Sequence, residues 1–314
     1  LETTATVDIN VNKANQTSLT ASASPSTIAF NGTTTLDAIG GSSGGAVSFA
    51  VTAGTNFCSV TGNLLTGLDV GSCTVTATRA GNALYNDVSA QVVVTVGRAL
   101  QTGWAVSGTP SATVSVNGTV TLSTSGGSGS GAVSLAITSG APSCSLSGNV
   151  VTGVTPGTCT VTATKAADTQ YESASATVDI QVEQAAQAPL AATATPATIS
   201  YLGSATLATT GGSGTGTVSF AVTVGAGQCQ LTGNLLTGIG VGGCTITATK
   251  AADINYGAAT ATVGVLVTKA TQPALSVAVS PSSLMLNGTA TLSTSGGAGT
   301  GLVNYSVTTG TGVC

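Results

Sequence analysis

Residues 58–78 spell CSVTGNLLTGLDVGSCTVTAT, and this stretch decides how the rest of the sequence is interpreted. Closely similar stretches begin at Cys144 and at Cys229. In each copy, two cysteines 15 positions apart enclose a Gly-Asn pair, and threonines alternate with small apolar residues after the second cysteine. Gly-Asn is typical of a tight turn, and alternation with period two is typical of a β-strand. We interpret the stretch as a small β unit closed by a disulfide.

The same spacing extends over the whole chain, which is therefore a repeat array. The first cysteine of each copy recurs after 85 or 86 positions, at Cys58, Cys144, Cys229 and Cys314. Prolines and tyrosines in constant surroundings recur with the same period, at Pro25, Pro110, Pro196, Pro281, Tyr85, Tyr171 and Tyr256. Three independent markers thus agree on one repeat length.

The period predicts where each repeat begins and ends. We expect complete repeats at residues 15–98, 99–184 and 185–269. Residues 3–11 (TTATVDINV) align with residues 174–182 (ASATVDIQV), so residues 1–14 are expected to be the last strand of a preceding repeat. Residues 270–314 are expected to be the first half of a further repeat. The chain is interpreted as a section of a longer array.

Each repeat is expected to hold about seven short strands separated by Gly, Pro and Asn turns. The first strand, near Leu19–Ser24, stops at Pro25, which belongs on an edge strand or at a switch between sheets because it lacks an amide hydrogen. Asn31-Gly32 favours a hairpin turn. Alternating runs such as Val47, Phe49 and Val51, or Val303, Tyr305 and Val307, predict half-buried strands.

This pattern predicts an all-β fold of tandem antiparallel β-sandwich domains, immunoglobulin-like in arrangement. A solenoid is less consistent with it, because solenoid repeats are typically about 20–45 residues long. The joints between repeats are a few residues long and contain no Gly/Ser run, as in Ala14-Asn15-Gln16. Short joints restrict bending. We therefore expect the domains to follow one another as beads in an extended rod.

The cysteines are expected to form structural disulfides. Equal spacing pairs Cys58 with Cys73, Cys144 with Cys159 and Cys229 with Cys244, and the partner of Cys314 would lie 15 positions further on. Zinc would need closer cysteine pairs or histidines, and the sequence has no histidine. Because disulfides persist in oxidising compartments, we expect a secreted protein, located outside the cell or at its surface.

Composition excludes several classes of partner. Only 5% of the residues are charged, and the six basic residues are spread over the chain, so nothing resembles a nucleic-acid surface. No apolar run approaches the roughly 20 residues of a membrane-spanning helix. A surface built of hydroxyl groups has little charge to oppose association. Three explanations are consistent with such a surface: glycosylation at Asn-Gly-Thr sequences, packing against neighbouring chains, and insolubility. The sequence does not choose among them.

No catalytic constellation is visible, and we expect no enzyme, no cofactor and no metal. Without histidine there is no common Ser-His or Cys-His pair. The glycine-rich loop Gly40–Gly45 lacks the Lys-Ser/Thr of a phosphate-binding loop. Asp168 and Asp253 recur, but Asn82 replaces them in the first repeat, which favours a solvated loop acid over a calcium ligand. Trp104 is interpreted as a core residue rather than as a ligand platform.

The series V-S-F-A-V-T, C-S-V-T-G-N-L-L-T-G, C-T-V-T-A-T-K-A-A-D and A-T-V-x-V-x-V resembles the tandem bacterial immunoglobulin-like (Big-type) repeat domains of large surface proteins and adhesins. The resemblance covers essentially the whole chain and implies an extracellular stalk or fibre whose modules carry no catalytic residues. The chain departs from antibody domains in two ways. No core tryptophan recurs, and the cysteines stand too close in sequence for the usual bridge between the sheets.

Three functions are consistent with these features. The first is a non-catalytic structural protein, a stalk or fibre of disulfide-closed repeats in a bacterial surface protein. The second is a self-assembling extracellular filament or sheath subunit, whose partners are other copies of itself. The third is a multivalent module for a glycan or another cell-surface ligand, with ice as one candidate because of the Thr-x-Thr faces. In all three, neighbouring repeats of the same chain are the first partners.

Overall fold

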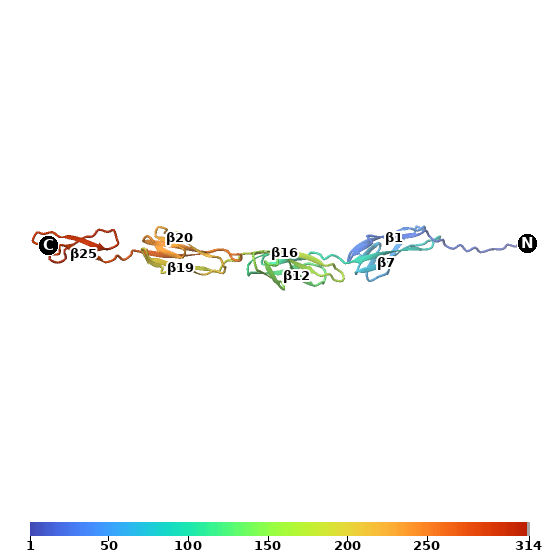
Figure 1. Ribbon diagram of the computed structural model, residues 1–314. Coiled ribbons are helices and arrows are strands. Elements are labelled where there is room, and N and C mark those ends of the chain that lie inside the picture. Colours follow the sequence, from blue (N-terminus) through green and yellow to red (C-terminus); the bar gives the residue numbers. More distant parts are fainter. Residues whose placement is uncertain (313–314) are drawn as a thin grey trace. The chain divides into compact units, whose positions relative to one another are not determined.

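The computed structural model describes residues 1–312, so the prediction for Cys314 lies outside the described residues. The described residues form strands, turns and loops without helices, which confirms the all-β class. The chain divides into two compact units, Leu1–Ala185 and Ala186–Cys314. Figure 1 labels the strands along the chain.

The first repeat is a two-sheet sandwich. Its strands are β1 (Leu19–Ser24), β2 (Thr27–Ala29), β3 (Thr33–Gly40), β4 (Val47–Ala53), β5 (Cys58–Thr61), β6 (Leu64–Gly67), β7 (Gly71–Arg79) and β8 (Val88–Gly97). One sheet has the order β1-β3-β6-β5 and the other has the order β2-β8-β7-β4. All neighbours are antiparallel except β2 and β8, which run parallel. The predicted antiparallel sandwich is confirmed in this repeat.

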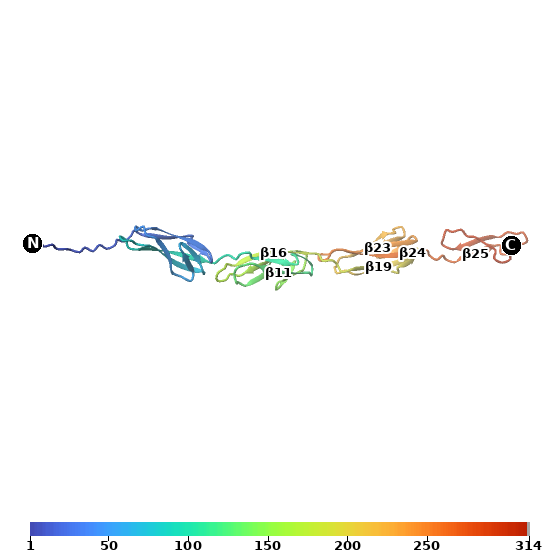
Figure 2. The same cartoon turned by 180° about the vertical axis from the view of Figure 1, so that it is seen from behind.

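The second and third repeats reproduce this topology (Figures 1 and 2). The second contains β9 (Ala105–Thr109), β10 (Thr113–Ser115), β11 (Thr119–Ser125), β12 (Val133–Ser139), β13 (Cys144–Ser147), β14 (Val150–Gly153), β15 (Gly157–Lys165) and β16 (Ala174–Glu183). The third contains β17 (Leu190–Thr195), β18 (Thr198–Ser200), β19 (Ser204–Gly211), β20 (Val218–Val224), β21 (Cys229–Thr232), β22 (Leu235–Gly238), β23 (Gly242–Lys250) and β24 (Ala259–Thr268).

The core of each repeat is made by the inward faces of its two sheets. In the first repeat, Leu36 and Leu65 from one sheet pack with Val75 and Val94 from the other, and all four are buried. Along β7 the buried side chains alternate with half-buried threonines, as the period of two predicts. Small β-branched and aliphatic side chains therefore fill the space between the sheets, with few aromatic rings among them.

Pro25 marks a switch between sheets, as predicted: β1 belongs to one sheet and β2 to the other. The interpretation of Asn31-Gly32 as a hairpin turn is wrong, because β2 and β3 do not pair and the turn carries the chain across the sandwich. Asn31 has a φ of 62° there, and Leu202 adopts 64° at the same place in the third repeat. A left-handed conformation costs a side chain such as leucine about 1–2 kcal/mol.

The three disulfides join the two sheets of each repeat, which corrects the expectation from their close spacing. Cys58 lies in β5 and Cys73 in β7, with their Cα atoms 6.1 Å apart. The hairpin partner β6 brings the chain back before it crosses to the other sheet, so 15 positions are enough. The second and third repeats have the same arrangement, and all six cysteines are buried.

Two predicted strands are not formed. Residues 3–11 carry no strand, and Val7, Ile9 and Val11 are more than 80% exposed (82%, 81% and 87%). Residues 303–307 also carry no strand, although β25 (Leu275–Ser280) and β26 (Thr291–Gly296) pair in the segment before them. Both sequences match strands that pair with β7 in the first repeat. Residues 270–312 contain no counterpart of β7, so the second sequence lacks the neighbour that would supply its hydrogen bonds.

Candidate functional site at the junctions between repeats

A glutamine at the start of each repeat fastens two loops together. In the first repeat, the side-chain oxygen of Gln16 accepts hydrogen bonds from the amides of Ser42 and Ser43 in the glycine-rich loop, each 3.0 Å long. Its side-chain nitrogen donates to the carbonyl of Asn86, at 2.7 Å, in the loop that contains the recurring tyrosine. We call the loop that contains this tyrosine the tyrosine loop. It comprises residues 82–86 in the first repeat, 168–172 in the second and 253–257 in the third.

The same contacts recur in the next two repeats. Gln101 accepts from the amide of Gly129 and donates to the carbonyl of Ala166. Gln187 accepts from Gly214 and donates to the carbonyls of Ala251 and Gly257. These glutamines stand in the joints at the start of each repeat, Ala14-Asn15-Gln16, Ala99-Leu100-Gln101 and Ala186-Gln187-Ala188, and the residues of the joints alone do not predict these contacts. Their spacing of 85 or 86 positions, equal to that of the cysteines, was the signal that could have identified them.

Asp168 makes the second contact between the same two loops. One carboxylate oxygen accepts from the amide and hydroxyl of Ser130, at 2.6 and 3.0 Å, and the other accepts from the amides of Gln170 and Tyr171, at 2.9 and 2.8 Å. The backbone hydrogen bond from Ser130, followed by those from Gln170 and Tyr171, lowers the pKa of Asp168 from 3.8 to about 2. Asp168 is half-exposed and therefore remains a loop acid that solvent can reach, and its carboxylate in addition holds the two loops together.

Asp253 is bound in the same way in the third repeat. It accepts from the amide of Thr215, and the backbone hydrogen bonds from Thr215 and Tyr256 are the main causes that lower its pKa to about 2. In both repeats, the atoms around the carboxylate include several amide hydrogens. A calcium ion would need oxygen atoms in these places. Among residues 1–312, no group of three or more His, Cys, Asp or Glu side chains could hold a metal ion.

The first repeat makes this contact with the opposite polarity. Asn82 replaces the aspartate, and its side-chain nitrogen donates to the carbonyl of Ser43 at 2.8 Å. Gly44, in the position of Ser130, has a φ of 69°, so the peptide group presents its carbonyl where the second repeat presents an amide hydrogen. The same two loops are therefore joined in two ways: Asn82 donates to a backbone carbonyl beside Gly44, and Asp168 accepts from the backbone amide of Ser130.

Replacing Asp168 with asparagine is expected to weaken the second repeat and to remove part of its acid sensitivity. The folded-state pKa of about 2 lies below the usual 3.8, so the wild-type contact stabilises above about pH 4 and is lost as the pH falls towards 2. In Asp168→Asn, an amide group faces amide donors at every pH. Hydrogen exchange of the second repeat between pH 2 and 7 measures both effects. The first repeat, which has Asn82, is the internal control, and an unchanged pH profile in the variant would contradict this prediction.

Within the unit Leu1–Ala185, one residue separates the backbone pairing of the first repeat from that of the second. The carbonyl of Gly97 accepts from the amide of Phe30, at 2.8 Å, at the end of the first repeat. The amide and carbonyl of Ala99 bind Gln170 and Glu172 in the tyrosine loop of the second repeat, each at 2.9 Å. Only Arg98 lies between these two anchored residues.

Side chains across the same junction add two contacts. The rings of Phe30 and Tyr171 meet edge to face, with centroids 5.6 Å apart and an interplanar angle of 83°. The side-chain nitrogen of Gln170 donates to a carboxylate oxygen of Asp69 at 3.3 Å. The tyrosine loop therefore binds its own repeat through Asp168 and the preceding repeat through Tyr171 and Gln170. We call the contacts of Phe30 and Asp69 with this loop the repeat junction.

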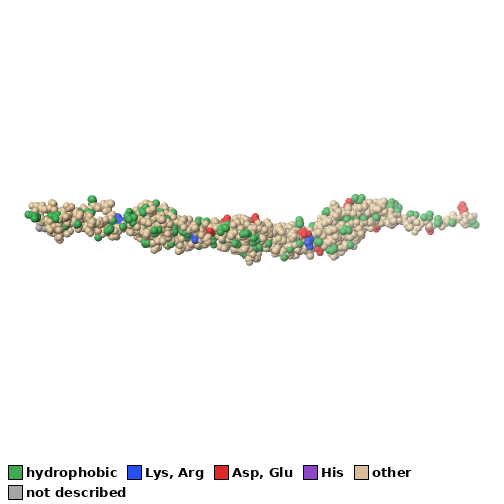
Figure 3. Space-filling model, viewed as in Figure 1, with side chains coloured by type: hydrophobic (Ala, Val, Ile, Leu, Met, Phe, Trp, Pro, Cys, Tyr) green, Lys and Arg blue, Asp and Glu red, His purple; other side chains and the backbone are tan. Residues whose placement is uncertain are grey.

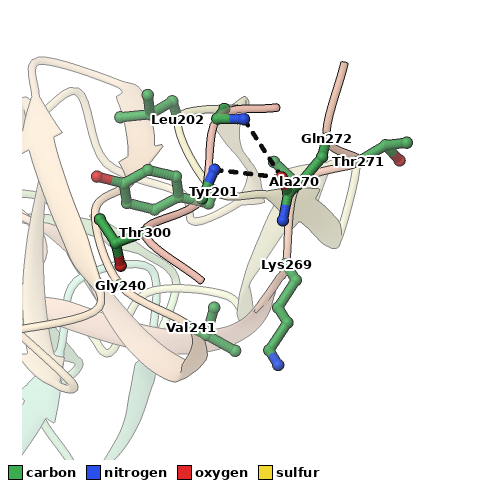
Figure 4. A pocket seen from close by; sticks show the side chains of 11 residues that line it. Tyr201, Leu202, Gly240, Val241, Lys269, Ala270, Thr271, Gln272 and Thr300 are labelled. Atoms are coloured by element: carbon green, nitrogen blue, oxygen red, sulfur yellow. Dashed lines mark hydrogen bonds between the residues drawn. The ribbon is translucent and has the colours of Figure 1, made fainter. Parts of the chain in front are cut away.

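A pocket of about 610 Å³ lies at the corresponding end of the third repeat, within the unit Ala186–Cys314. Figure 4 shows Tyr201, Leu202 and Val241 on one side of it and the segment Lys269–Gln272 on the other. Tyr201 stands in the place of Phe30. It is 44% exposed, whereas Phe30 is half-buried against Tyr171.

Trp104 lies at the start of the second repeat and is half-buried, outside the cluster of fully buried core residues. Its indole nitrogen donates to the carbonyl of Ala163 at 3.1 Å, and the ammonium group of Lys165 lies 5.5 Å from the ring centroid. The ring is thus occupied by contacts within its own repeat.

The surface of the described residues carries few charges, and Figure 3 shows them as small separate spots on the visible face. No helix in residues 1–312 has the length and apolar character needed to cross a membrane.

No protein-family model and no curated protein matches the sequence. Solved structures resemble it at low identity. Domains 1–6 of the surface-layer protein SbsC share 15% identity, with a TM-score of 0.31, over 91% of this chain and 49% of that one, so the chain spans about half of that structure. The Escherichia coli adhesin FdeC shares 15% (TM-score 0.25; 82% and 99% covered), and protocadherin gammaB7 EC3-6 shares 13% (0.28; 84% and 77%). These scores assign the chain to no family.

Proposed function

We propose that this chain is a non-catalytic structural segment of an extracellular stalk or fibre, in which disulfide-closed immunoglobulin-like repeats set a distance in a bacterial surface protein or adhesin. The repeat junction is the observation that carries this proposal. A spacer must resist bending, and a single residue between two hydrogen-bonded anchors leaves little freedom at the joint. The buried disulfides support it further, because they stabilise repeats that must persist outside the cell.

The overall dimensions of the chain in solution test the spacer function. Strand β8 has 10 residues and so spans roughly 33 Å. Three repeats in series would be roughly 100 Å long or more, with a radius of gyration of about 30 Å or above. A compact chain of 314 residues would have a radius of gyration of about 20 Å. Small-angle X-ray scattering separates the two, and a value near 20 Å would contradict a stalk.

The junction itself is tested by Tyr171→Ala. We expect this variant to loosen the first repeat against the second, because it removes the ring that packs against Phe30. Spin labels on added cysteines at the exposed positions Ser48 and Ser134 report the distance distribution, which should broaden. Tyr85→Ala is the matched control, since Tyr85 occupies the equivalent loop of the first repeat and does not lie at this junction. Equal distributions in both variants would show that the ring contact does not set the junction.

A further inference from the structure

Residues 270–312 form the first half of a sandwich. Strands β25 and β26 pair from Leu275 with Gly296 to Ser280 with Thr291, the same register that joins β1 to β3 from Leu19 with Gly40 to Ser24 with Thr35. Gln272 accepts hydrogen bonds from the amides of Ala298 and Gly299, as Gln16 does from its own glycine-rich loop. The local structure of a repeat is therefore present without its second sheet.

The apolar face of β25 and β26 is uncovered. Leu275 is 50% exposed and Leu292 is 45% exposed. Their counterparts in the first repeat, Leu19 and Leu36, are 8% and 1% exposed because the sheet that contains β7 and β8 covers them. In all three complete repeats, the two longest strands of this covering sheet come from the second half of the repeat.

The side-chain nitrogen of Gln272 is a second observation at this half of a sandwich. Among residues 1–312 it has no hydrogen-bond partner. In the complete repeats, this nitrogen donates to backbone carbonyls in or just before the tyrosine loop. The free donor is therefore placed to bind a tyrosine loop.

The pocket beside Tyr201 provides the third observation. At the junction in the first unit, a tyrosine ring packs on Phe30 and Gln170 binds Asp69. The third repeat has Gly240 in the place of Asp69, and next to it Leu202 and Val241 are 67% and 54% exposed. This surface offers a neighbouring loop apolar contacts where the first junction offers a carboxylate.

We propose that the surface formed by Tyr201, Leu202, Val241 and Gln272, with the uncovered face of β25 and β26, binds the second half of a repeat, and that it selects a tyrosine loop with an apolar residue before the tyrosine. Leu84-Tyr85 of the first repeat has this character, whereas Gln170-Tyr171 of the second does not. The junctions would then follow a pairing rule: a polar loop binds the end that carries Asp69, and an apolar loop binds the end that carries Leu202. This inference rests on the repeat geometry and does not require the chain to be a stalk.

Two fusions to the full chain test the proposal. In one, residues 59–97 follow Cys314, which takes the place of Cys58; in the other, residues 145–183 follow it in the same way. Both fusions are expected to protect the amides of β25 and β26 from hydrogen exchange by at least about 100-fold, because the completed sandwich covers this strand pair and its amides then exchange only when the whole repeat opens. Peptide mapping is expected to show a fourth disulfide at Cys314. Unchanged fast exchange of β25 and β26 in both fusions would overturn the proposal.

The apolar selection is tested by a second comparison within these fusions. The amides of Tyr201 and Leu202 are expected to be protected more strongly by the fusion that carries Leu84, and a leucine-to-glutamine change at that position of the fused segment should remove the difference. Leu202→Asn, the residue found at the equivalent place in the other repeats, should also remove it while β25 and β26 stay protected. Equal protection by both fusions would refute the pairing rule. Concentration-dependent protection in the unfused chain would identify a second copy as the occupant instead.

Discussion

Replacing Cys144 and Cys159 together with alanine is expected to lower the free energy of unfolding of the second repeat by about 3 kcal/mol. A bridge across 15 positions restricts the unfolded chain by roughly this amount. The loss is a large fraction of the 5–15 kcal/mol that is typical of a whole domain. Because both cysteines are buried, at 3% and 0% exposure, the variant also loses packing between the two sheets. Hydrogen exchange in increasing urea measures the second repeat separately from its neighbours.

The first and third repeats serve as controls for the disulfide variant, since their own bridges stay intact in the same molecule. Ser145→Ala, next to Cys144 on the exposed face of the strand, controls for the substitution itself. A second repeat that keeps its unfolding free energy to within about 1 kcal/mol would show that the bridge contributes little to folding. The disulfides would then no longer support the proposal through the stability that they give to repeats outside the cell.

Replacing Gly126 with alanine is expected to destabilise the second repeat by roughly 3 kcal/mol or more. Gly126 has a φ of 75°, a conformation that costs an alanine about 1–2 kcal/mol. The added methyl group would also collide with the backbone carbonyl of Gly103, which belongs to the neighbouring chain segment and cannot rotate away. Overpacking of this kind adds about 1–3 kcal/mol. Urea unfolding followed by hydrogen exchange measures the total.

Gly148→Ala separates the two parts of that cost. Gly148 also has a positive φ, of 59°, but nothing lies within 4 Å of the position its methyl group would take. We expect this variant to lose only the conformational part, about 1–2 kcal/mol. If both glycine variants lose the same free energy of unfolding, the close approach of Gly126 to Gly103 adds no steric cost, and the prediction for Gly126 is wrong.

The sequence predicted the features that depend on local pattern. Cys73, Val75 and Ala77 are buried along β7 because a period of two places them on one face, and Pro25 separates strands of different sheets because it lacks an amide hydrogen. Local pattern does not identify a strand's partner. For this reason the Asn-Gly pattern predicts a hairpin at Asn31-Gly32, although this turn crosses the sandwich, and the close cysteine spacing does not predict that the disulfides join the sheets.

The contacts of the candidate site were harder to predict because they join residues far apart in the sequence. Phe30 and Tyr171 belong to different repeats. The tyrosine recurs in every complete repeat, but the position of Phe30 holds Val116 and Tyr201 in the next two repeats, so the repeat pattern does not reveal the pair. Asp168 illustrates a different limit. Its recurrence was visible, but its partners are backbone amides, whose positions depend on the folded loops rather than on residue type.

The position of the disulfide also governs how a repeat lengthens under tension. If pulling separates the sheets of the first repeat, the 15 positions between Cys58 and Cys73 stay closed as a loop. This loop therefore does not extend, and the length released on unfolding is shorter by roughly 50 Å, at about 3.3–3.6 Å per residue. A ruptured repeat would yield a shorter, covalently limited extension and would keep its two sheets connected, ready to re-form once the load is removed.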